Sequence, residues 1–389
     1  MNSDNNNSNT PRLRFPGFTG EWEFVNGDLL FKPISNKNHN SDLPILALTQ
    51  DQGAVPRDQI NYNVFVSEKS VAGYKVVEVD DFIISLRSFQ GGIEYSRYKG
   101  LCSPAYIVLR KKSDELCSDF YRIYFKSFNY IQDLNKNLEG IRDGKMISYK
   151  QFSEIKLPLP TPAEQEKIAS CLKAMDELIA LQGQKVEALK ERKRGLMQQL
   201  FPQPGETTPR LRFPGFTADW QEEKAMDICT TVAPPLKLQS KDYLLEGKYP
   251  IVDQSQTLIC GWTNEEAGLI SKSPVIIFGD HTCALKFIDF PFVQGADGVK
   301  ILSVKKDYNA QYVFQAFSAN PVKQDGYKRH FSDFKEKVFM LATDPAEQEK
   351  IAECLSEMDS LITSEAAKLE ALQAHKRGLM QQLFPQPSK

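Results

Sequence analysis

The sequence has few of the side chains that build small catalytic or metal centres. Its four histidines, His39, His281, His330 and His375, are scattered along the chain. A zinc site or a histidine-based catalytic cluster is therefore not expected. The seven cysteines contain no CxxC pair, and an odd number of dispersed cysteines argues against both a disulfide framework and a zinc ribbon. We expect reduced thiols and no bound metal.

Long apolar segments and a strong charge of one sign are also absent. No run of about 18 apolar residues occurs, and the opening MNSDNNNSNT lacks the charged start and apolar centre of a signal peptide. We therefore expect a cytoplasmic protein without membrane contact. The net charge is only -2 over 389 residues. Any nucleic-acid binding must then rest on local patches or on the charge of a partner.

Sequence motifs of cofactor-binding enzymes are missing as well. Neither the GxxxxGK[ST] loop nor GxGxxG occurs. An adenine methyltransferase needs an Asn, Asp or Ser followed by two prolines and an aromatic residue. The nearest string is Ala233-Pro234-Pro235-Leu236, which has neither the amide nor the ring. We expect no catalytic residue and no cofactor in this chain.

What the chain does contain is an internal duplication. TPRLRFPGFTGEW (10–22) returns as TPRLRFPGFTADW (208–220), and a second segment at 162–204 recurs at 345–387 with identical ends and a diverged middle. Such repeats decide the architecture and are best identified first. We therefore expect a function that requires two copies of one structural part.

Each long repeat predicts one helix. Thr161 and Asp344 are cap residues followed by proline, and Glu164 or Glu347 is placed to complete a capping box. A Leu-Phe-Pro sequence ends both copies, because proline cannot continue a helix. The predicted length is about 39 residues, or roughly 58 Å at 1.5 Å per residue.

Apolar residues in both helices alternate in steps of four and three, which is the heptad pattern of helices that pack at a shallow angle. Polar residues occupy the fifth and eighth positions of each seam, and the spacing leaves the orientation of the pair open. The apolar seam consists of Ile168, Leu172, Met175, Ile179, Val186, Leu189, Leu196, Leu200, Ile351, Leu355, Met358, Ile362, Leu369, Leu372, Leu379 and Leu383.

The remaining segments, head 1 (24–160) and head 2 (221–343), are rich in β-branched and aromatic runs broken by glycine and proline. They are only faintly alike and predict small mixed domains. The fold class is therefore α+β, with a pseudo-twofold duplication. The predicted parts are a lead-in (1–23), head 1, a helix (161–204), a linker with the repeated lead-in (205–220), head 2 and a final helix (344–389).

Together these features resemble the specificity subunit of type I restriction-modification systems. The resemblance rests on LRFPGF with an acidic residue and Trp22 or Trp220 after it, on the LPLPTPAEQEKI start of a helix, and on its KRGLMQQLF end. It covers essentially the whole chain. The motifs are specific because each repeated one occurs twice in the expected order.

The resemblance implies a DNA-binding function without catalysis. Each head would be a target recognition domain that reads one half of a bipartite double-stranded DNA site. The two helices would form an antiparallel coiled coil that sets the spacing. The repeated regions would dock two modification (methyltransferase) subunits, which carry S-adenosylmethionine, and restriction subunits would join the full complex. Half-sites one helical turn apart lie about 34 Å from each other, a distance that the predicted helices can span.

Candidate DNA-contacting residues follow from the chemistry of base and phosphate recognition. Arginine and lysine bind guanine, amides bind adenine, and basic or small polar groups bind phosphates. Weaker candidates are Gln50, Gln52, Gln254 and Gln256. The main candidates are Arg57, Arg87, Ser88, Gln90, Tyr95, Arg97, Tyr98, Lys99, Arg142 and Lys145 in head 1, and His281, Thr282, Lys286, Lys328, Arg329 and His330 in head 2.

Two other interpretations compete with this one. A self-sufficient restriction or modification enzyme would need its own set of residues that bind a cofactor or a metal ion. The GDHTC string (279–283) is the nearest candidate, but the matching LRSFQ of head 1 has none of its groups. A coiled-coil adaptor that binds only proteins would explain the helices but not the arginine- and amide-rich loops of two diverged heads.

Overall fold

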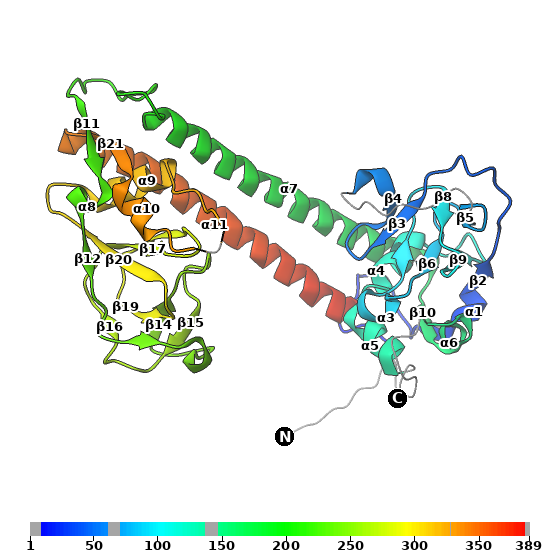
Figure 1. Ribbon diagram of the computed structural model, residues 1–389. Helices are drawn as coiled ribbons and strands as arrows, with labels where there is room; N and C mark the ends of the chain where they lie inside the picture. Colours follow the sequence, from blue (N-terminus) through cyan, green and yellow to red (C-terminus); the bar gives the residue numbers. More distant parts are fainter. Residues whose placement is uncertain (1–8, 61–70, 137–146, 327, 386–389) are drawn as a thin grey trace. The chain divides into compact units, whose positions relative to one another are not determined.

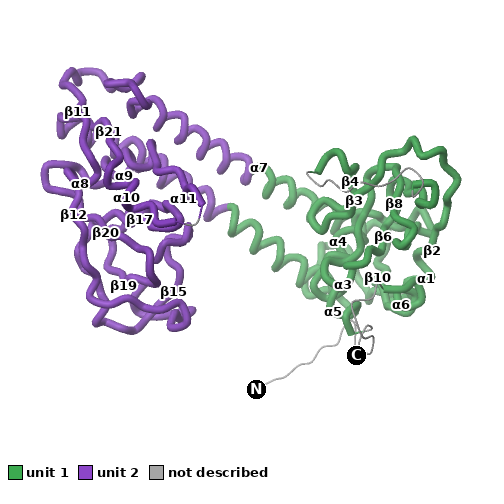
Figure 2. The backbone as a smooth tube through the Cα atoms, viewed as in Figure 1, with its two compact units in different colours: residues 1–181, 369–389 green, residues 182–368 purple. Residues whose placement is uncertain are grey.

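The computed structural model describes residues 9–60, 71–136, 147–326 and 328–385 (Figure 1). Contacts divide the chain into two compact units, unit 1 (1–181 and 369–389) and unit 2 (182–368) (Figure 2). Each unit combines one head with the beginning of one long helix and the end of the other. The units therefore divide both helices, whereas the repeats in the sequence suggest helices separate from the heads.

The two long helices, α7 (Pro162–Leu200) and α11 (Pro345–Leu383), have the predicted length of 39 residues each. All sixteen apolar seam residues are buried or half-buried. In unit 1, Ile168 near the start of α7 shares a core with Leu383 at the end of α11. In unit 2, Leu200 at the end of α7 shares a core with Ile351 near the start of α11. Within each unit the helices are therefore antiparallel.

Polar seam positions agree with this orientation. Gln182 donates to a carboxylate oxygen of Glu365 at 2.7 Å. Lys193 binds Asp359 at 2.7 Å, and Lys376 binds Asp176 in the equivalent way. A parallel pair would instead have placed the two lysines at the same level, where like charges repel. These lysines neutralise aspartates of the partner helix.

Each head begins and ends in a short antiparallel strand pair. In head 1, β1 (Glu23–Asn26) pairs with β10 (Lys156–Leu159). In head 2, β11 (Trp220–Lys224) pairs with β21 (Val338–Ala342). The chain thus leaves each lead-in and returns to each long helix through neighbouring strands.

The main sheets of the two heads share one topology despite their weak sequence similarity. Head 1 has the order β2 (Phe31–Ile34), β9 (Ile107–Lys111), β6 (Phe82–Ile84), β7 (Glu94–Tyr95). Head 2 has the order β12 (Cys229–Val232), β20 (Val299–Val304), β17 (Val275–Gly279), β18 (Leu285–Ile288). All these pairs are antiparallel. Residues 82–110 of head 1 and 275–304 of head 2 therefore carry equivalent strands at equivalent places.

Further elements complete each head. Head 1 contains β3 (Leu46–Thr49), β4 (Gly53–Pro56), β5 (Lys75–Val77), β8 (Gly100–Cys102), a 3₁₀ turn (Arg57–Gln59), α1 (Gly27–Leu30), α3 (Ser88–Gly91), α4 (Ser118–Tyr124), α5 (Phe128–Lys136) and α6 (Tyr149–Glu154). Head 2 contains β13 (Lys237–Leu238), β14 (Tyr249–Val252), β15 (Gly261–Thr263), β16 (Leu269–Ile270), β19 (Phe292–Gly295), a 3₁₀ turn (Ser240–Asp242), α8 (Ala225–Ile228), α9 (Ala310–Ala319) and α10 (Phe331–Glu336).

The repeated tryptophans anchor the heads to the helix ends. Trp22 is 2% exposed and packs edge-on against Phe120, which also contacts Phe384 beyond α11. Trp220 is 6% exposed and packs against Phe201 beyond α7. Large aromatic rings bury much apolar area and pack best edge to face. Both tryptophans are therefore packing anchors between a head and a helix end.

The glutamates at the helix starts do not act as capping-box residues. Both carboxylate oxygens of Glu164 accept from Arg14 at 2.8 Å, and Glu347 binds Arg212 in the same way at 2.7 Å. Each glutamate is only 1% exposed. A buried carboxylate takes the forked guanidinium in preference to a backbone amide, because the bidentate pair neutralises its charge. The repeated LRFPGF therefore fixes the lead-in to the helix start.

Candidate nucleic-acid interface

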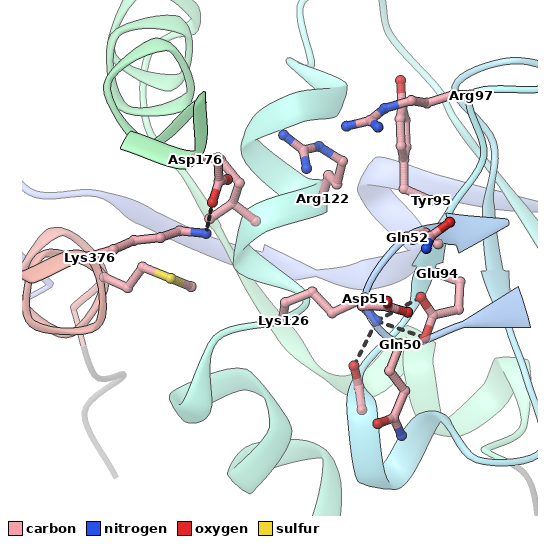
Figure 3. Close-up of a pocket in the computed structure, with 14 residues that line it drawn as sticks. Gln50, Asp51, Gln52, Glu94, Tyr95, Arg97, Arg122, Lys126, Asp176 and Lys376 are labelled. Carbon is pink, nitrogen blue, oxygen red and sulfur yellow. Dashed lines mark hydrogen bonds and ion pairs between the residues drawn. The ribbon is translucent and has the colours of Figure 1, made fainter. Parts of the chain in front are cut away.

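In head 1, four of the candidates line a cavity of about 550 Å³, namely Gln50, Gln52, Tyr95 and Arg97 (Figure 3). The turn between β3 and β4 contributes Gln50, Asp51 and Gln52, and the segment around β7 contributes Tyr95 and Arg97. Arg122 of α4 and Lys126 of the turn that follows α4 close another side, and both long helices also line the cavity. The fold thus brings one arginine candidate together with the two amides that the sequence ranked lower.

An ion pair forms part of the cavity wall. Lys126 binds both carboxylate oxygens of Glu94 at 2.7 Å and the carbonyl oxygen of Gly91 at 2.8 Å. Burial raises the pKa of Glu94, and Lys126 partly offsets this effect. The pair fixes the loop between α3 and β7, which precedes Arg97. We interpret it as the rigid support of the candidate loop.

Arg97 is the candidate of this cavity that is best placed to contact a ligand. Its side chain is exposed, and among the described residues no ion pair or side-chain hydrogen bond engages it. Gln52 of the β3–β4 turn is likewise exposed. Tyr95 differs, because its hydroxyl donates to Asp80 and its ring packs on Phe82 with centroids 5.3 Å apart. The arginine and the amides are therefore the free donors, and the tyrosine is structural.

The other candidates of head 1 divide by exposure. Arg87 and Gln90 are exposed, Arg57 is half-buried, and Tyr98 is 37% exposed. Lys99 is exposed but paired with Glu78 at 3.0 Å. Ser88 is 1% exposed and accepts from the amide of Ser85 at 2.7 Å, so it stabilises its own turn. Arg142 and Lys145 lie outside the described residues.

In head 2, the candidates His281 and Thr282 lie on the turn that follows β17, whereas Lys286 is in β18 and the other candidates directly precede α10. Asp280 accepts from the amides of His330 and Phe331 at 2.7 and 2.9 Å and so joins this turn to α10. The hydroxyl of Thr282 donates to the carbonyl of Gln254 at 2.6 Å, and the amide of His281 donates to the Gln254 side chain at 3.2 Å. Asp280 thus bonds the backbone at the start of α10 through both its carbonyl and a carboxylate oxygen.

Lys286 and His330 are buried, contrary to the exposure that a phosphate contact requires. Lys286 is 5% exposed and donates to the carbonyls of Asp253 and Thr257 at 2.8 and 2.5 Å. Burial lowers the pKa of this ammonium group. The lysine therefore fixes the 253–257 loop, which carries Gln254 and Gln256. His330 has no exposed surface, because the start of α10 packs it inward.

Fewer candidate residues are exposed in head 2 than in head 1. Arg329 and Gln256 are exposed. Lys328 is exposed but lies 3.4 Å from Asp325 and 3.6 Å from Asp333. Gln254 is half-buried and lies against Gly298, which has a φ of +85° and where an added Cβ would come within 2.8 Å of the Gln254 amide. Head 2 therefore presents the 253–257 loop, which carries two glutamines and is fixed by hydrogen bonds from Lys286.

Several residues of these sites have no signal in the local sequence. Arg122 lies in α4 and Lys126 in the turn after it, both far along the sequence from the candidate loops, and Asp176 and Lys376 come from the two long helices. Only the folded chain brings them to the cavity. Within the described ranges, no helix is long and apolar enough to cross a membrane. No group of three or more His, Cys, Asp or Glu that could hold a metal ion occurs in the described part of the chain.

Comparison with known proteins supports the resemblance to specificity subunits that the sequence motifs indicate. Residues 23–191 match the family described as type I restriction modification DNA specificity domain. A putative type I restriction enzyme MjaX specificity subunit of Methanocaldococcus jannaschii is 33% identical over 127 residues, which is 33% of this chain and 29% of that protein. The EcoR124I/EcoR124II specificity subunit of Escherichia coli is 31% identical over 107 residues, 26% of each chain. Each match spans less than a third of the relative.

Solved structures extend the likeness to nearly the whole fold. The S subunit of a type I restriction-modification system from M. genitalium has a TM-score of 0.58 at 14% identity, over 97% of this chain and 99% of that one. A chain from a study of complex assembly and conformational transition of the type I R-M system has a TM-score of 0.55 at 14% identity, over 97% and 100%. The fold of this chain is thus similar to the folds of these two solved chains. The match over residues 23–191 and the two relatives support the assignment of this chain to the type I restriction-modification specificity subunits.

Proposed function

We propose that this chain reads a two-part DNA sequence, each head contacting one half-site, and that it delivers modification subunits to that site. The observation that carries the proposal is the shared frame of the two heads. Their main sheets have the same order, but the loops after the equivalent strands β6 and β17, LRSFQ and GDHTC, differ in chemistry. A constant frame with unlike loops suits the recognition of two unlike sequences.

The donors of each head match the groups that bases display in the major groove. In head 1, Arg97 is suited to the paired acceptors of guanine, and Gln50 and Gln52 to the donor and acceptor of adenine. In head 2, Gln254 and Gln256 offer the same amide chemistry. The exposed cations Arg87 and Arg329 are suited to phosphates, which fix register without reading sequence.

Affinity must come partly from elsewhere. The net charge of -2 gives the isolated chain no overall attraction to a polyanion. Partner subunits therefore supply much of the phosphate contact, together with S-adenosylmethionine and the methyl transfer to adenine. Restriction subunits join this core in the cleaving complex. The antiparallel helices α7 and α11 would set the gap between the half-sites.

The test is methylation in a host that lacks background adenine methylation. The modification subunit is expressed with this chain, without it, or with Arg97→Ala, and the genome is sequenced by a method that detects N6-methyladenine. We expect methylation only with both proteins, in a two-part motif with a fixed gap. Arg97→Ala should relax or abolish one half of the motif and leave the other intact.

Two outcomes would contradict the proposal. Methylation by this chain alone would reveal an active site of its own. No methylation by a folded pair that forms a complex would favour the alternative of a protein-binding adaptor without DNA readout.

A further inference from the structure

Helix α4 of head 1 and helix α9 of head 2 start from the same contact with a long helix. In unit 1, the amide of Cys117 donates to the side chain of Gln165 in α7 at 2.9 Å. In unit 2, the amide of Asn309 donates to the side chain of Gln348 in α11, also at 2.9 Å. Cys117 and Asn309 each directly precede their helix, so they are equivalent positions.

Aromatic contacts keep the same register farther along the two helices. Phe120 of α4 packs against Trp22, and Tyr312 of α9 packs against Trp220, with ring centroids 6.0 and 6.3 Å apart. Each aromatic residue follows the first contact of its helix by the same number of residues. The residues of α4 therefore correspond one to one with those of α9.

The lead-ins also meet the long helices at equivalent places. In unit 1, the amide of Leu13 donates to the carbonyl of Gln382 at 3.1 Å, and in unit 2 the amide of Leu211 donates to the carbonyl of Gln199 at 2.9 Å. Both units are thus built on one plan. A contact between head and helix that occurs in only one unit marks a difference between the heads.

Such a difference occurs at the equivalent positions 123 and 315, which hold isoleucine in head 1 and glutamine in head 2. Gln315 has no exposed surface, and its side-chain amide donates to a carboxylate oxygen of Asp359 in α11 at 2.9 Å. The same carboxylate binds Lys193 of α7 at 2.7 Å. Gln315 thereby ties head 2 to an ion pair that joins both long helices.

In unit 1, the corresponding ion pair is not bonded to the head. Among the described residues, the side chains of Asp176 and Lys376 bond only each other (Figure 3). Ile123 lines the same cavity as this pair and has no polar atom to offer it. Apolar contact is non-directional, whereas a hydrogen bond requires a narrow range of distance and angle. Only head 2 has a directional contact at this place.

Stability alone does not explain a glutamine at position 315. Its side-chain oxygen has no hydrogen-bond partner among the described residues, and a buried unpaired acceptor destabilises a fold. An apolar residue, as in head 1, would avoid this cost. A buried polar side chain can instead select one arrangement of packed helices, as polar residues do in coiled coils.

We infer that Gln315 is a positioning residue that holds head 2 in one orientation on the helix pair and thereby restricts the gap between the half-sites. The inference rests on the proposed function and adds a residue of head 2 to the helices as a determinant of the gap. Gln348 and Asp359 lie roughly 16 Å apart along α11. Two polar contacts at this separation fix the direction of α9 along α11, which one contact alone does not.

The test is the gap that methylome sequencing finds with the modification subunit. Gln315→Met keeps the length of the side chain but removes the bond to Asp359. Both half-sites should keep their sequence. Methylation at sites whose gap is one base pair longer or shorter should rise roughly tenfold over the wild type, because a hydrogen bond to a charged group contributes about that factor or more. Gln311→Met, at a half-buried position of the same helix, is the matched control and should keep a single gap.

Two further variants separate positioning from stability. Gln315→Ile introduces the residue type of head 1 and should broaden the gap in the same way. Asp359→Asn still offers an oxygen to Gln315, so it should keep the single gap although it weakens the ion pair with Lys193. The Tm of Gln315→Met should be unchanged or higher, because Asp359 stays paired with Lys193 and no charge is left isolated.

Several results would overturn the inference. A single gap in both Gln315 variants would show that the residue does not position head 2. Failure of both variants to fold would make it a stabilising residue, and a changed half-site sequence would assign it to base reading. In each case, a two-part motif with the wild-type chain would leave the proposed function intact. No methylation with a folded wild-type pair would overturn both.

Discussion

At the scale of single residues, buried charges fix the loops that carry the candidate contacts. Lys126 supports the cavity of head 1 through Glu94, and Lys286 supports the amide loop of head 2 through two carbonyls. Neither lysine is placed to reach DNA directly. Each acts by holding exposed neighbours in one geometry, which base recognition requires.

Lys286→Met should alter recognition of only one half-site. The substitution keeps the apolar stem but removes the donors to Asp253 and Thr257, so Gln254 and Gln256 lose their fixed position. A misplaced base contact costs about 1–3 kcal/mol of discrimination. Methylome sequencing should show one relaxed half-site and one unchanged. The exposed Lys272→Met is the control, and relaxation of both halves would argue against this role.

Arg14→Ala should destabilise the protein strongly. It leaves Glu164, only 1% exposed, without its partner, and breaking a buried pair on one side costs about 3–5 kcal/mol. Thermal unfolding should show a clear decrease in Tm. Adding Glu164→Gln should restore part of it, because the unpaired charge is gone. An unchanged Tm for Arg14→Ala would mean that the lead-in is not needed to hold the helix start.

Residue-scale predictions from sequence succeeded where exposure did not matter and failed where it did. The LRFPGF arginines and tryptophans are visible as repeated letters. The burial of Ser88, Lys286 and His330 is not, because a polar residue next to a turn looks the same whether its side chain points outward or into the head. Distant supports such as Lys126 have no local signal at all.

At the scale of elements, the long helices were the most predictable part. Proline and cap residues mark their starts and Leu-Phe-Pro their ends, and these are local signals. Their direction was not predictable, since a heptad seam reads equally well both ways. Contacts between Gln182 and Glu365 and between lysines and aspartates decide it. The short strands of the heads depend on long-range pairing, so only their approximate places were foreseen.

Glu365 should make stability depend on acid pH. Hydrogen bonds from Gln182, Lys368 and Lys185 lower the pKa of this carboxyl from 4.5 to about 2. A lowered folded-state pKa stabilises the protein above the unfolded pKa, and this contribution is lost as pH falls from about 4.5 towards 2. The Tm of the wild type should therefore decrease more over this window than that of Glu365→Gln. Equal decreases would show that the contacts of Glu365 do not stabilise the pair.

At the scale of the whole molecule, the duplication predicts interchangeable heads. Both heads begin and end in the same antiparallel strand pair, with Glu23 opposite Leu159 and Trp220 opposite Ala342. A chimera with two copies of head 1, in which residues 24–160 also replace residues 221–343, should fold. The lead-ins and long helices on either side of the two heads are equivalent.

Such a chain should direct methylation to a motif whose two parts are the same. Methylome sequencing with the modification subunit checks this, and the wild-type chain is the control. A folded chimera whose motif keeps two unlike parts would show that the heads do not determine the half-sites.

The contact between Leu13 and Gln382 has a consequence for topology. It repeats the contact between Leu211 and Gln199, although a continuous linker joins only the second pair. Each helix end thus meets a lead-in, once in each unit, and the chain is continuous across only one of these two places. If the other place were also joined, the lead-ins, heads and helices would form a closed cycle. A linker with the sequence of 201–210 that joins the ends near Leu13 and Gln382, together with a break in that native segment, would yield a circular permutant with the same contacts. The native chain and this permutant would therefore be two orders of the same parts that give the same architecture.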